Sequence, residues 1–552
     1  MQIALSKRWS RRPIQRSRRQ ILALLILVLL VTSTRGDAFP TPKLADVNPA
    51  GIDGALVICG GGKLPDAVLD RFLELAGGKE ARLVVMPTAA ERADDGELDS
   101  YATTWRDRGF PTVHVLHAND RTVADSDAFI APLKSATAVW FVGGQQSRIA
   151  KAYVGTRVEQ ELYALLERGG AIGGTSAGAA IQSRLMIAFG NPEATVVQGF
   201  DLVPGAVIDQ HFKARNRQPR LTAVLAAHPG YFGLGIDERT GLIIRGRRIQ
   251  VVGDSTVTVC LSKSANRPAL QYEIPAGKAA DLTALRRAAI ARAAPAFPPE
   301  TPAVPRVEKG SLMIVGGGRL SEEMWRQFVE LAGGSESHIV IVPTAVENPP
   351  LGDRREVREL KQAGAKTVTV LHTTDRAESD RDEFIEPLRR ATGVWFGGGR
   401  QWRLVDAYEG TATCKAFHDV LRRDGVIGGS SAGATIQGDY LVRGNPLGNR
   451  DMMAEGYERG FAFLPGCAID QHFTQRRRQP DMEAVKQAFP QLLGIGIDES
   501  TALVVQKTNA RVIGAHDVYF YDATPCETSG QLDFTRVGRG RAYDLERRVQ
   551  IE

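Results

Sequence analysis

The sequence predicts an α/β fold in which mostly parallel strands alternate with helices. Short apolar runs rich in β-branched residues, such as Arg82 to Met86 and Ala138 to Phe141, are typical of strands covered on both faces of a sheet. Longer segments between them, such as Asp66 to Ala76 and Arg157 to Arg168, carry Leu, Val and Ala at helical spacing. This alternation favours layered sheets flanked by helices.

The same pattern occurs twice along the chain. The run from Leu56 to Gly62 matches the run from Leu312 to Gly318, and each ends in three glycines. The segment from Val84 to Ala89 matches the segment from Val340 to Ala345, and both matches are offset by 256 residues. A repeat of this length predicts duplicated domains, because solenoid repeats are far shorter.

An Ala- and Pro-rich segment separates the two copies. Residues 288–307 contain five prolines among small residues, a composition typical of a semi-rigid linker. We therefore expect one domain at residues 48–287 and a second at residues 308–552. A chain of 552 residues is long enough for two domains of ordinary size.

Residues 1–38 predict a signal peptide. The first 36 residues contain eight Lys and Arg and no acidic residue, and Ile21 to Val31 form an uninterrupted apolar run. This run is shorter than the roughly 20 residues that span a bilayer, so we expect no stable membrane span after processing, with a signal anchor as the alternative. The pair Arg18-Arg19 is similar to a twin-arginine signal. We expect an exported protein, either periplasmic or secreted.

The charge of the remaining chain argues against nucleic-acid binding. The whole sequence has 69 Lys and Arg and 63 Asp and Glu. Since eight of the basic residues lie in the N-terminal segment, the rest of the chain has 61 basic and 63 acidic residues. A nearly neutral chain does not favour DNA or RNA as a partner. The five cysteines are scattered and have no metal-ligand spacing, so we expect no metal site.

Each copy has a candidate nucleophile in a Gly-x-Ser-x-Gly motif. Ser176 and Ser431 each follow an apolar run that predicts a strand and precede a segment compatible with a helix. Small neighbours allow the sharp turn that exposes such a serine. The same turn directs the backbone amides of Ala177 and Ala432 toward an oxyanion.

A candidate base and candidate acids follow each serine. His211 and His472 occur in matching Asp-Gln-His-Phe segments, and a serine nucleophile requires such a base. A Gly-Ile-Asp-Glu segment comes next in each copy. Alternate strand residues point to opposite sides, so only one acid of each pair can reach the histidine, and the spacing does not choose between them. These pairs are Asp237 with Glu238 and Asp498 with Glu499.

With Ser, His and Glu in this order, the chain resembles the cyanophycinase family, which is grouped with the aspartyl dipeptidase peptidase E. The motifs that carry the resemblance are Gly-Gly-x-Ser-Ala-Gly-Ala, Asp-Gln-His-Phe and Gly-Ile-Asp-Glu, within residues 50–275 and again within 308–525. The resemblance implies two domains similar to class I glutamine amidotransferases, without metal or organic cofactor. It also implies catalytic roles as nucleophiles (Ser176, Ser431), general bases (His211, His472) and orienting acids (Glu238, Glu499).

The resemblance further implies residues that contact the substrate. Gly-Gly-x-Gln segments supply oxyanion amides from Gly144 and Gly399 and pocket glutamines Gln146 and Gln401. Residues around each histidine complete the set: Asp209, Gln210, Arg215, Arg217 and Arg220 in the first copy, and Asp470, Gln471, Arg476 and Arg478 in the second. Asp481 stands where a third arginine is expected in the second copy. Because guanidinium groups pair with carboxylates, this difference predicts weaker substrate binding there.

The resemblance implies hydrolysis of cyanophycin, a poly-aspartate backbone with arginine on its side chains, to β-aspartyl-arginine dipeptides through an acyl-enzyme. An exported dipeptidase that acts on aspartyl or isoaspartyl peptides is the alternative within the family. A non-catalytic binding protein on the same fold is a third possibility. The retention of Ser, His and Glu in both copies disfavours it.

Overall fold

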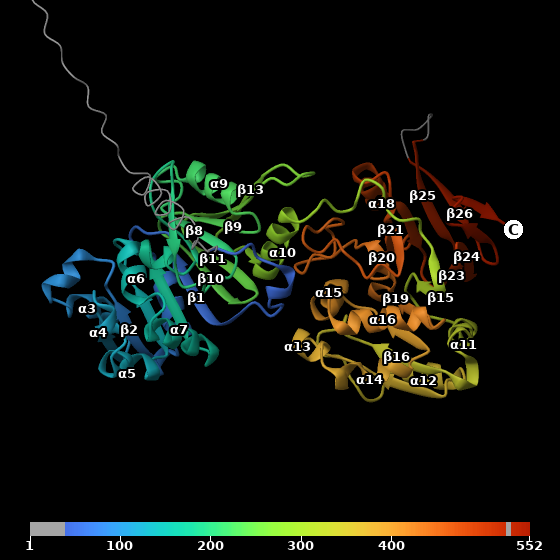
Figure 1. The fold of residues 1–552 in the computed structure, drawn as a ribbon, viewed down its shortest axis with the longest axis horizontal. Coiled ribbons are helices and arrows are strands. Elements are labelled where there is room, and N and C mark those ends of the chain that lie inside the picture. Colours follow the sequence, from blue (N-terminus) through green and yellow to red (C-terminus); the bar gives the residue numbers. More distant parts are fainter. Residues whose placement is uncertain (1–38, 526–531) are drawn as a thin grey trace, which may run out of the picture. The chain divides into compact units, whose positions relative to one another are not determined.

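A computed structural model describes residues 39–525 and 532–552, so the predicted signal peptide lies outside the described residues. Each copy of the repeat has its own main sheet and its own smaller sheet, with helices packed against them (Figure 1). The predicted α/β class is confirmed. The likeness to glutamine amidotransferases stays a prediction.

The main sheet of the first copy has eight strands in the order β14-β11-β10-β1-β5-β4-β2-β3. Its five parallel strands are β1 (Ile52–Cys59), β5 (Ala171–Thr175), β4 (Ala138–Phe141), β2 (Arg82–Met86) and β3 (Thr112–Val115). The antiparallel strands are β10 (Thr240–Gly246), β11 (Arg248–Gly253) and β14 (Ala279–Asp281).

Both faces of this sheet are buried, which explains its continuous apolar strands. On β1, Leu56 and Ile58 pack into a core that includes helix α7, whereas Val57 and Cys59 pack into a core that includes Phe72 of helix α2. The helices of the first copy are α2 (Asp66–Leu75), α3 (Ser100–Asp107), α4 (Arg121–Ala124), α5 (Asp127–Ser135), α6 (Gln146–Tyr153), α7 (Arg157–Glu167), α8 (Ala177–Ala180), α9 (Gln218–Ala227) and α10 (Leu282–Ala293).

The smaller sheet of the first copy delivers the histidine and the acids. Its order is β13-β12-β9-β8, and parallel strands β8 (Ala206–Gln210) and β9 (Phe232–Ile236) end just before His211 and Asp237. Parallel strands place their carboxyl ends at one edge, so these residues lie close together. The remaining strands are β12 (Thr256–Leu261) and β13 (Leu270–Pro275), with a separate hairpin of β6 (Leu185–Phe189) and β7 (Thr195–Gln198).

The second copy repeats this plan. Its main sheet has the order β17-β16-β18-β19-β15-β23-β24-β27-β28, and its smaller sheet the order β20-β21-β22-β25-β26. The main-sheet strands are β15 (Val307–Val315), β16 (His338–Val342), β17 (Thr367–Val370), β18 (Gly393–Phe396), β19 (Val426–Ser430), β23 (Thr501–Lys507), β24 (Asn509–Gly514), β27 (Ala542–Asp544) and β28 (Val549–Ile551). The smaller sheet contains β20 (Gly438–Tyr440), β21 (Leu464–Gln471), β22 (Leu493–Ile497), β25 (Val518–Pro525) and β26 (Leu532–Val537).

The helices of the second copy follow in the same relative positions. They are α11 (Glu322–Leu331), α12 (Arg355–Gln362), α13 (Arg376–Ser379), α14 (Asp382–Arg390), α15 (Gln401–Tyr408), α16 (Ala412–Arg422), α17 (Ala432–Thr435) and α18 (Gln479–Ala488). Between the copies, α10 continues to Ala293, so the start of the predicted linker is helical. The domain limits themselves stay a prediction.

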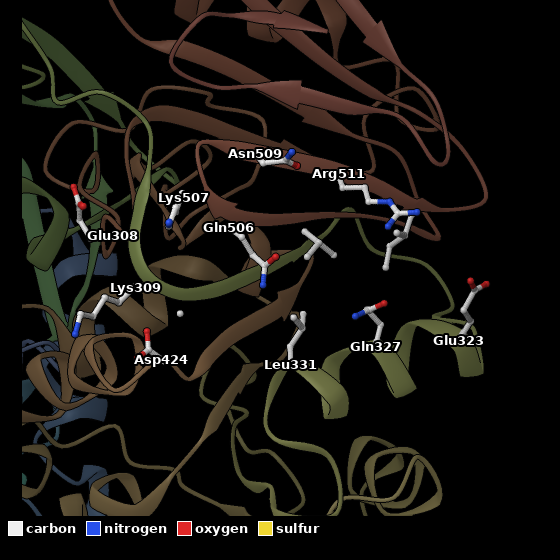
Figure 2. A pocket seen from close by; sticks show the side chains of 13 residues that line it. Glu308, Lys309, Glu323, Gln327, Leu331, Asp424, Gln506, Lys507, Asn509 and Arg511 are labelled. Atoms are coloured by element: carbon white, nitrogen blue, oxygen red, sulfur yellow. The ribbon is translucent and has the colours of Figure 1, made fainter. Parts of the chain in front are cut away.

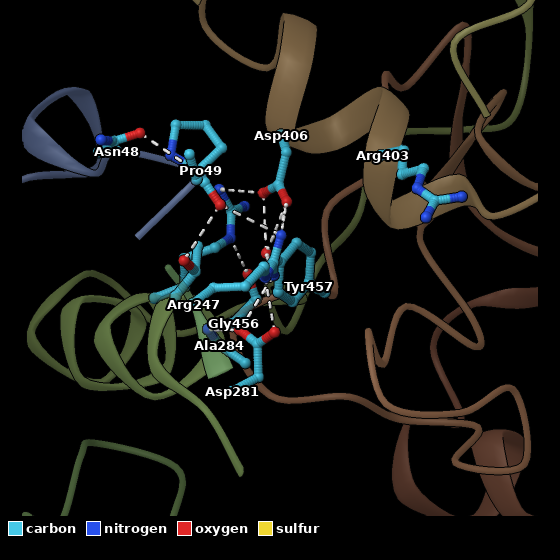
Figure 3. Close-up of polar contacts among 12 residues, drawn as sticks. Asn48, Pro49, Arg247, Asp281, Ala284, Arg403, Asp406, Gly456 and Tyr457 are labelled. Carbon is cyan, nitrogen blue, oxygen red and sulfur yellow. Dashed lines mark hydrogen bonds and ion pairs between the residues drawn. The ribbon is translucent and has the colours of Figure 1, made fainter. Parts of the chain in front are cut away.

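Side chains of the two copies meet around Arg247 (Figure 3). Its guanidinium donates to Asp281 of the first copy at 2.6 Å, and to Asp406 and the Tyr457 hydroxyl of the second copy, both at 2.8 Å. The Tyr457 hydroxyl donates in turn to Asp406 at 2.8 Å. Burial raises the pKa of Tyr457 well above its ordinary value, so this link stays a neutral phenol between charged partners.

A polar pocket of about 780 Å³ lies at the amino-terminal end of β15 (Figure 2). Charged side chains line it, among them Lys309, Asp424 and Arg511. The opposite end of β15 is bonded to the predicted nucleophile, because the Ser431 amide donates to the Val315 carbonyl. The pocket therefore does not belong to the predicted active site.

None of the helices within residues 39–525 and 532–552 combines the length and apolar character that a membrane span needs. In the same residues, no group of three or more His, Cys, Asp and Glu side chains is placed to hold a metal ion.

Candidate active site

Both predicted nucleophiles lie at a sharp turn between a strand and a helix. Ser176 connects β5 to α8 with φ 53° and ψ −109°, and Ser431 connects β19 to α17 with φ 57° and ψ −114°. A positive φ is uncommon for a residue other than glycine and marks local strain. The Ser176 amide donates to the Cys59 carbonyl at 3.0 Å, which ties the turn to the end of β1.

The flanking glycines make this turn possible. A Cβ atom on Gly174 would lie 2.2 Å from the carbonyl oxygen of Gly178, and one on Gly178 would lie 2.2 Å from that of Phe141. The corresponding glycines of the second copy, Gly429 and Gly433, are equally crowded. The Gly-x-Ser-x-Gly motif is therefore required here by close backbone packing.

The structure brings the predicted serine, histidine and glutamate of each copy into one hydrogen-bonded series. Ser176 Oγ lies 2.9 Å from His211 Nε2, and His211 Nδ1 lies 2.6 Å from Glu238 Oε1. In the second copy, Ser431 Oγ lies 2.9 Å from His472 Nε2, and His472 Nδ1 lies 2.5 Å from an oxygen of Glu499. This geometry favours a histidine that donates from Nδ1 and accepts the serine proton at Nε2.

The structure also separates the two adjacent acids. Asp237 turns away from His211, and its carboxylate accepts hydrogen bonds from the Ser255 hydroxyl at 2.7 Å and the Lys213 amide at 3.2 Å. In the second copy, Asp498 accepts from the amide and hydroxyl of Thr474 at 2.9 and 2.6 Å. The aspartates therefore fix the segment after the histidine, while the glutamates reach the histidine ring.

The surroundings of both histidines lower their pKa values. Burial lowers the pKa of His211 below its ordinary value, the hydrogen bond to Glu238 opposes this, and the charge of Arg215 adds to the lowering. The pKa of His472 is lowered in the same way, with Glu499 and Arg476 as the corresponding neighbours. A lowered pKa keeps the imidazole neutral at neutral pH, as a general base must be.

The residues predicted to stabilise an oxyanion lie beside each serine. A Cβ atom on Gly143 would lie 3.4 Å from Ser176 Cβ, so the Gly143-Gly144 segment runs directly past the nucleophile. Gly144 has φ 144°, and a Cβ atom there would lie 2.1 Å from the Ala89 carbonyl oxygen. Gly399 has the same conformation. Ala177 and Ala432 open α8 and α17, where first-turn amides have no acceptor within the helix.

The predicted pocket glutamines are buried, and the nitrogen of each side-chain amide is held by hydrogen bonds to backbone carbonyls. Gln146 donates to the Ile187 carbonyl at 2.8 Å. Gln401 donates to the carbonyls of Val442 and Arg443 at 2.7 and 2.9 Å. Gln210 and Gln471 are also buried, and within the described part of the chain Oε1 of Gln471 has no hydrogen-bond partner. A buried acceptor of this kind can receive a hydrogen bond from a ligand.

The arginines after His211 have different surroundings. Arg215 is exposed next to His211, whereas Arg217 is mostly buried and donates to the Gln210 carbonyl at 2.7 Å. Arg220 is 3% exposed, and its guanidinium binds both oxygens of the fully buried Asp209. Arg220 also donates to the Gly190 carbonyl at 2.7 Å. These partners occupy Arg220, so it does not fit the substrate-binding role that the sequence analysis gave it.

The second copy also has both exposed and buried arginines after its histidine. Arg476 is exposed next to His472, and Arg478 is buried and donates to Asp470 and to the Gln471 carbonyl at 2.8 and 2.7 Å. Asp481, at the position of Arg220, is paired with an arginine of its own copy. It accepts a hydrogen bond from Arg443 at 2.6 Å, and Arg443 also pairs with the buried Asp470 at 3.0 Å. The expectation of a weaker second site, which rested on Asp481, therefore loses its basis.

Comparison with known proteins identifies the family of the chain. The model of peptidase family S51 matches residues 56–252 and 312–513, which together are more than half of the chain. The chain belongs to peptidase family S51. It is a serine-type peptidase, and the two matched ranges confirm the tandem duplication of an S51 domain.

Two curated relatives each align with less than half of this chain. A cyanophycinase of Geminocystis herdmanii is 30% identical over 244 residues, which are 43% of this chain and 87% of that protein. A cyanophycinase of Synechococcus elongatus is 34% identical over 222 residues, which are 39% of this chain and 68% of that protein.

Two solved structures are also similar over one copy. A peptidase from an acI-B1 Actinobacterium is 24% identical and covers 42% of this chain and 98% of its own, with a TM-score of 0.35. A putative peptidase E protein from Listeria monocytogenes EGD-e is 16% identical and covers 38% of this chain and 99% of its own, with a TM-score of 0.29.

Two features of the S51 sites are absent from the predicted set. A Cβ atom on Gly61 would lie 2.2 Å from Cε1 of His211, and one on Gly317 would lie 2.2 Å from Cε1 of His472. The three-glycine run that both copies share after a strand was the signal for this contact. The second feature is Arg443, which lies in a longer stretch of the second copy, and no motif pointed to it.

Proposed function

We propose that both copies hydrolyse the backbone amide bonds between aspartates of cyanophycin and release β-aspartyl-arginine dipeptides. The observation that carries the proposal is the complete Ser-His-Glu series in each copy, with serine to histidine distances of 2.9 Å in both. The cyanophycinases among its relatives support the choice of substrate.

The proposed reaction begins with the serine hydroxyl. Ser176 Oγ attacks the backbone α-carbonyl carbon of an aspartyl unit while His211 Nε2 takes its proton, and Glu238 holds the Nδ1 proton and stabilises the resulting imidazolium. The amides of Gly144 and Ala177 stabilise the negative oxygen of the tetrahedral intermediate. His211 then gives its proton to the leaving amine, and an acyl-enzyme with an ester bond to Oγ remains.

Water completes the cycle. His211 removes a proton from water, the hydroxide oxygen attacks the acyl carbon, and the ester breaks as Oγ recovers the proton. Ser431, His472 and Glu499 follow the same steps, with Gly399 and Ala432 as the oxyanion donors. Apart from water and the substrate, every group used in these steps belongs to the chain.

Substrate recognition is assigned to the exposed cations and the buried amides beside each histidine. Arg215 and Arg476 are exposed next to the histidines, where a guanidinium can pair with a carboxylate of the substrate. Gln146, Gln210, Gln401 and Gln471 supply neutral hydrogen-bonding groups. Asp209, Asp470, Arg217, Arg220 and Arg478 act on the substrate indirectly, because they bind one another or the backbone before the histidine.

The proposal includes export and a fold similar to class I glutamine amidotransferases in two domains, at residues 48–287 and 308–552. Export is supported by the basic segment and the apolar run Ile21 to Val31. The measurement is the N-terminus of the secreted or periplasmic protein by mass spectrometry, expected between Ser33 and Pro40. Mature protein that retains Met1 would contradict it.

The activity is tested with intact polymer and with short peptides. Incubation with cyanophycin should release β-aspartyl-arginine, identified by mass spectrometry, and the Ser176→Ala/Ser431→Ala variant should release none. Cleavage of short isoaspartyl peptides without attack on polymer would favour the dipeptidase instead. Failure to cleave either substrate would refute the hydrolase proposal.

A further inference from the structure

We infer that Arg443 is a positioning residue of the second active site. It binds a buried carboxylate there, as Arg220 does in the first site, but it approaches that carboxylate from the opposite side. This inference rests on the proposed function, because it assigns a residue to the proposed second site. It also explains why that site retains its geometry although Asp481 stands where the first copy has an arginine.

In the first copy the arginine comes from the helix. Arg220 lies in the first turn of α9 and binds the Asp209 carboxylate through two nitrogens. Its remaining terminal nitrogen donates to the carbonyl of Gly190, just after β6, the strand whose Ile187 carbonyl holds Gln146. Arg220 thus connects the aspartate two residues before His211 to the segment that fixes the pocket glutamine.

In the second copy the arginine comes from the segment after β20. The Arg443 guanidinium lies 3.1 and 3.3 Å from the two oxygens of Asp470 through Nε, and 3.0 Å from one of them through a terminal nitrogen. It reaches Asp481 in the first turn of α18 at 2.6 Å. The Arg443 carbonyl accepts from Gln401 at 2.9 Å, so the same residue holds the pocket glutamine.

The two arrangements are reciprocal. Counted from the matched serines, Arg443 falls at the position of Ala188, and counted from the matched histidines, Asp481 falls at the position of Arg220. The first copy therefore has a cation on the helix and none on the facing segment, while the second has an anion on the helix and the cation on the facing segment. The buried carboxylates, Asp209 and Asp470, are both fully shielded from solvent.

This connection matters because of where the carboxylates lie. Asp470 is the penultimate residue of β21, directly before Gln471, and its carboxylate is enclosed by Arg443 and Arg478. A buried carboxylate that loses a bidentate partner must shift or be rehydrated. Since His472 follows two residues later at φ 51°, a shift of this segment moves the imidazole relative to Ser431.

The test uses the full chain and reads the two serines separately. A serine-directed phosphonylating reagent labels the activated nucleophile, and mass spectrometry of peptides gives the rate at Ser431 with Ser176 as an internal reference. Arg443→Ala should slow labelling of Ser431 by about tenfold or more and leave Ser176 unchanged. The double variant Arg443→Ala/Asp481→Arg rebuilds the arrangement of the first copy and should restore most of the lost rate.

Two further variants complete the design. Arg450→Ala removes an exposed arginine of the same segment and should leave both rates unchanged. If Arg443→Ala does not fold, Arg443→Lys keeps the charge without the forked guanidinium and should give an intermediate rate. Normal labelling in Arg443→Ala, or no recovery in the double variant, would overturn the inference.

A kinetic readout separates positioning from substrate binding. In a Ser176→Ala background, Arg443→Ala should lower kcat on cyanophycin with little change in KM, whereas a change confined to KM would make Arg443 a substrate ligand and overturn the inference. If neither serine of the unchanged protein reacts, the proposed function fails. The reciprocal arrangement is then tested by the denaturant midpoint of unfolding. Adding Asp481→Arg to Arg443→Ala should recover the stability that Arg443→Ala loses, and no recovery would overturn the inference.

Discussion

Glu238 lies 2.6 Å from Nδ1 of His211, while its neighbour Asp237 points to the other side of the strand end and accepts from Ser255 at 2.7 Å. The two acids differ by one position in the chain and perform different tasks. Glu238 orients the base, and Asp237 holds the segment that follows the histidine. The same separation occurs between Glu499 and Asp498.

Glu238→Gln should therefore impair chemistry more than Asp237→Asn does. In a Ser431→Ala background, we expect Glu238→Gln to lower kcat by about 10²- to 10⁴-fold, because the amide cannot stabilise the imidazolium. Asp237→Asn should lower the melting temperature with a smaller effect on kcat. Kinetics and thermal unfolding of both variants check this, and the reverse ranking would exchange the two roles.

The rate should fall in acid as the histidine becomes protonated. Burial lowers the pKa of His211 below the ordinary value of about 6.5, so the active neutral form persists to lower pH than for an exposed histidine. The hydrogen bond to Glu238 raises that pKa, so Glu238→Gln should move the acid limb of the profile to still lower pH. A pH profile of kcat/KM for each single-site variant measures this shift. A shift to higher pH would contradict the assignment.

Gly61→Ala should inactivate the first site selectively. A methyl group there would lie 2.2 Å from the His211 ring, and Gly61 has φ 106°. Gly109→Ala is the matched control, because Gly109 has φ 98° with nothing within 4 Å of the added carbon. We expect labelling of Ser176 to fall by roughly 100-fold or more in Gly61→Ala and to be unchanged in Gly109→Ala. Equal rates in the two variants would show that the ring can move aside.

The two sites should contribute comparable turnover. Arg443 supplies the cation that is missing at position 481. The second triad therefore keeps the serine-histidine distance of the first. Ser176→Ala and Ser431→Ala should each retain a substantial part of the activity on cyanophycin, and the double variant should retain none. Complete loss from either single substitution would show that the copies form one composite site.

The parts of the site that were predictable from sequence are those built from short local segments. The strand ends before Ser176 and His211 follow from apolar runs, and the turn at Ser176 follows from glycines that leave room for the backbone. The choice between Asp237 and Glu238 was not settled by spacing, because adjacent residues at a strand end differ in direction and only tertiary contacts show which direction faces the histidine.

Arg220 and Arg443 show why the roles of other residues could not be predicted from the sequence. Arg220 belongs to a run of arginines that resembles a ligand-binding set, yet burial and Asp209 determine what it contacts. Arg443 falls at the position of Ala188, so the first copy does not suggest its task. A side chain's partner across 27 residues, such as Asp470 for Arg443, is fixed by how the strands pack and not by local pattern.

The reciprocal ion pairs also limit how one copy could have changed into the other by single substitutions. A form with arginine on both the helix and the facing segment places three guanidinium groups around one buried aspartate, because Arg217 or Arg478 also binds it. A form with arginine on neither, and aspartate on the helix, confronts two carboxylates with a single remaining arginine and leaves buried negative charge uncompensated. Either intermediate leaves unbalanced charge around the aspartate that precedes the histidine, so the two positions are expected to have changed in close succession, whichever copy retains the ancestral state.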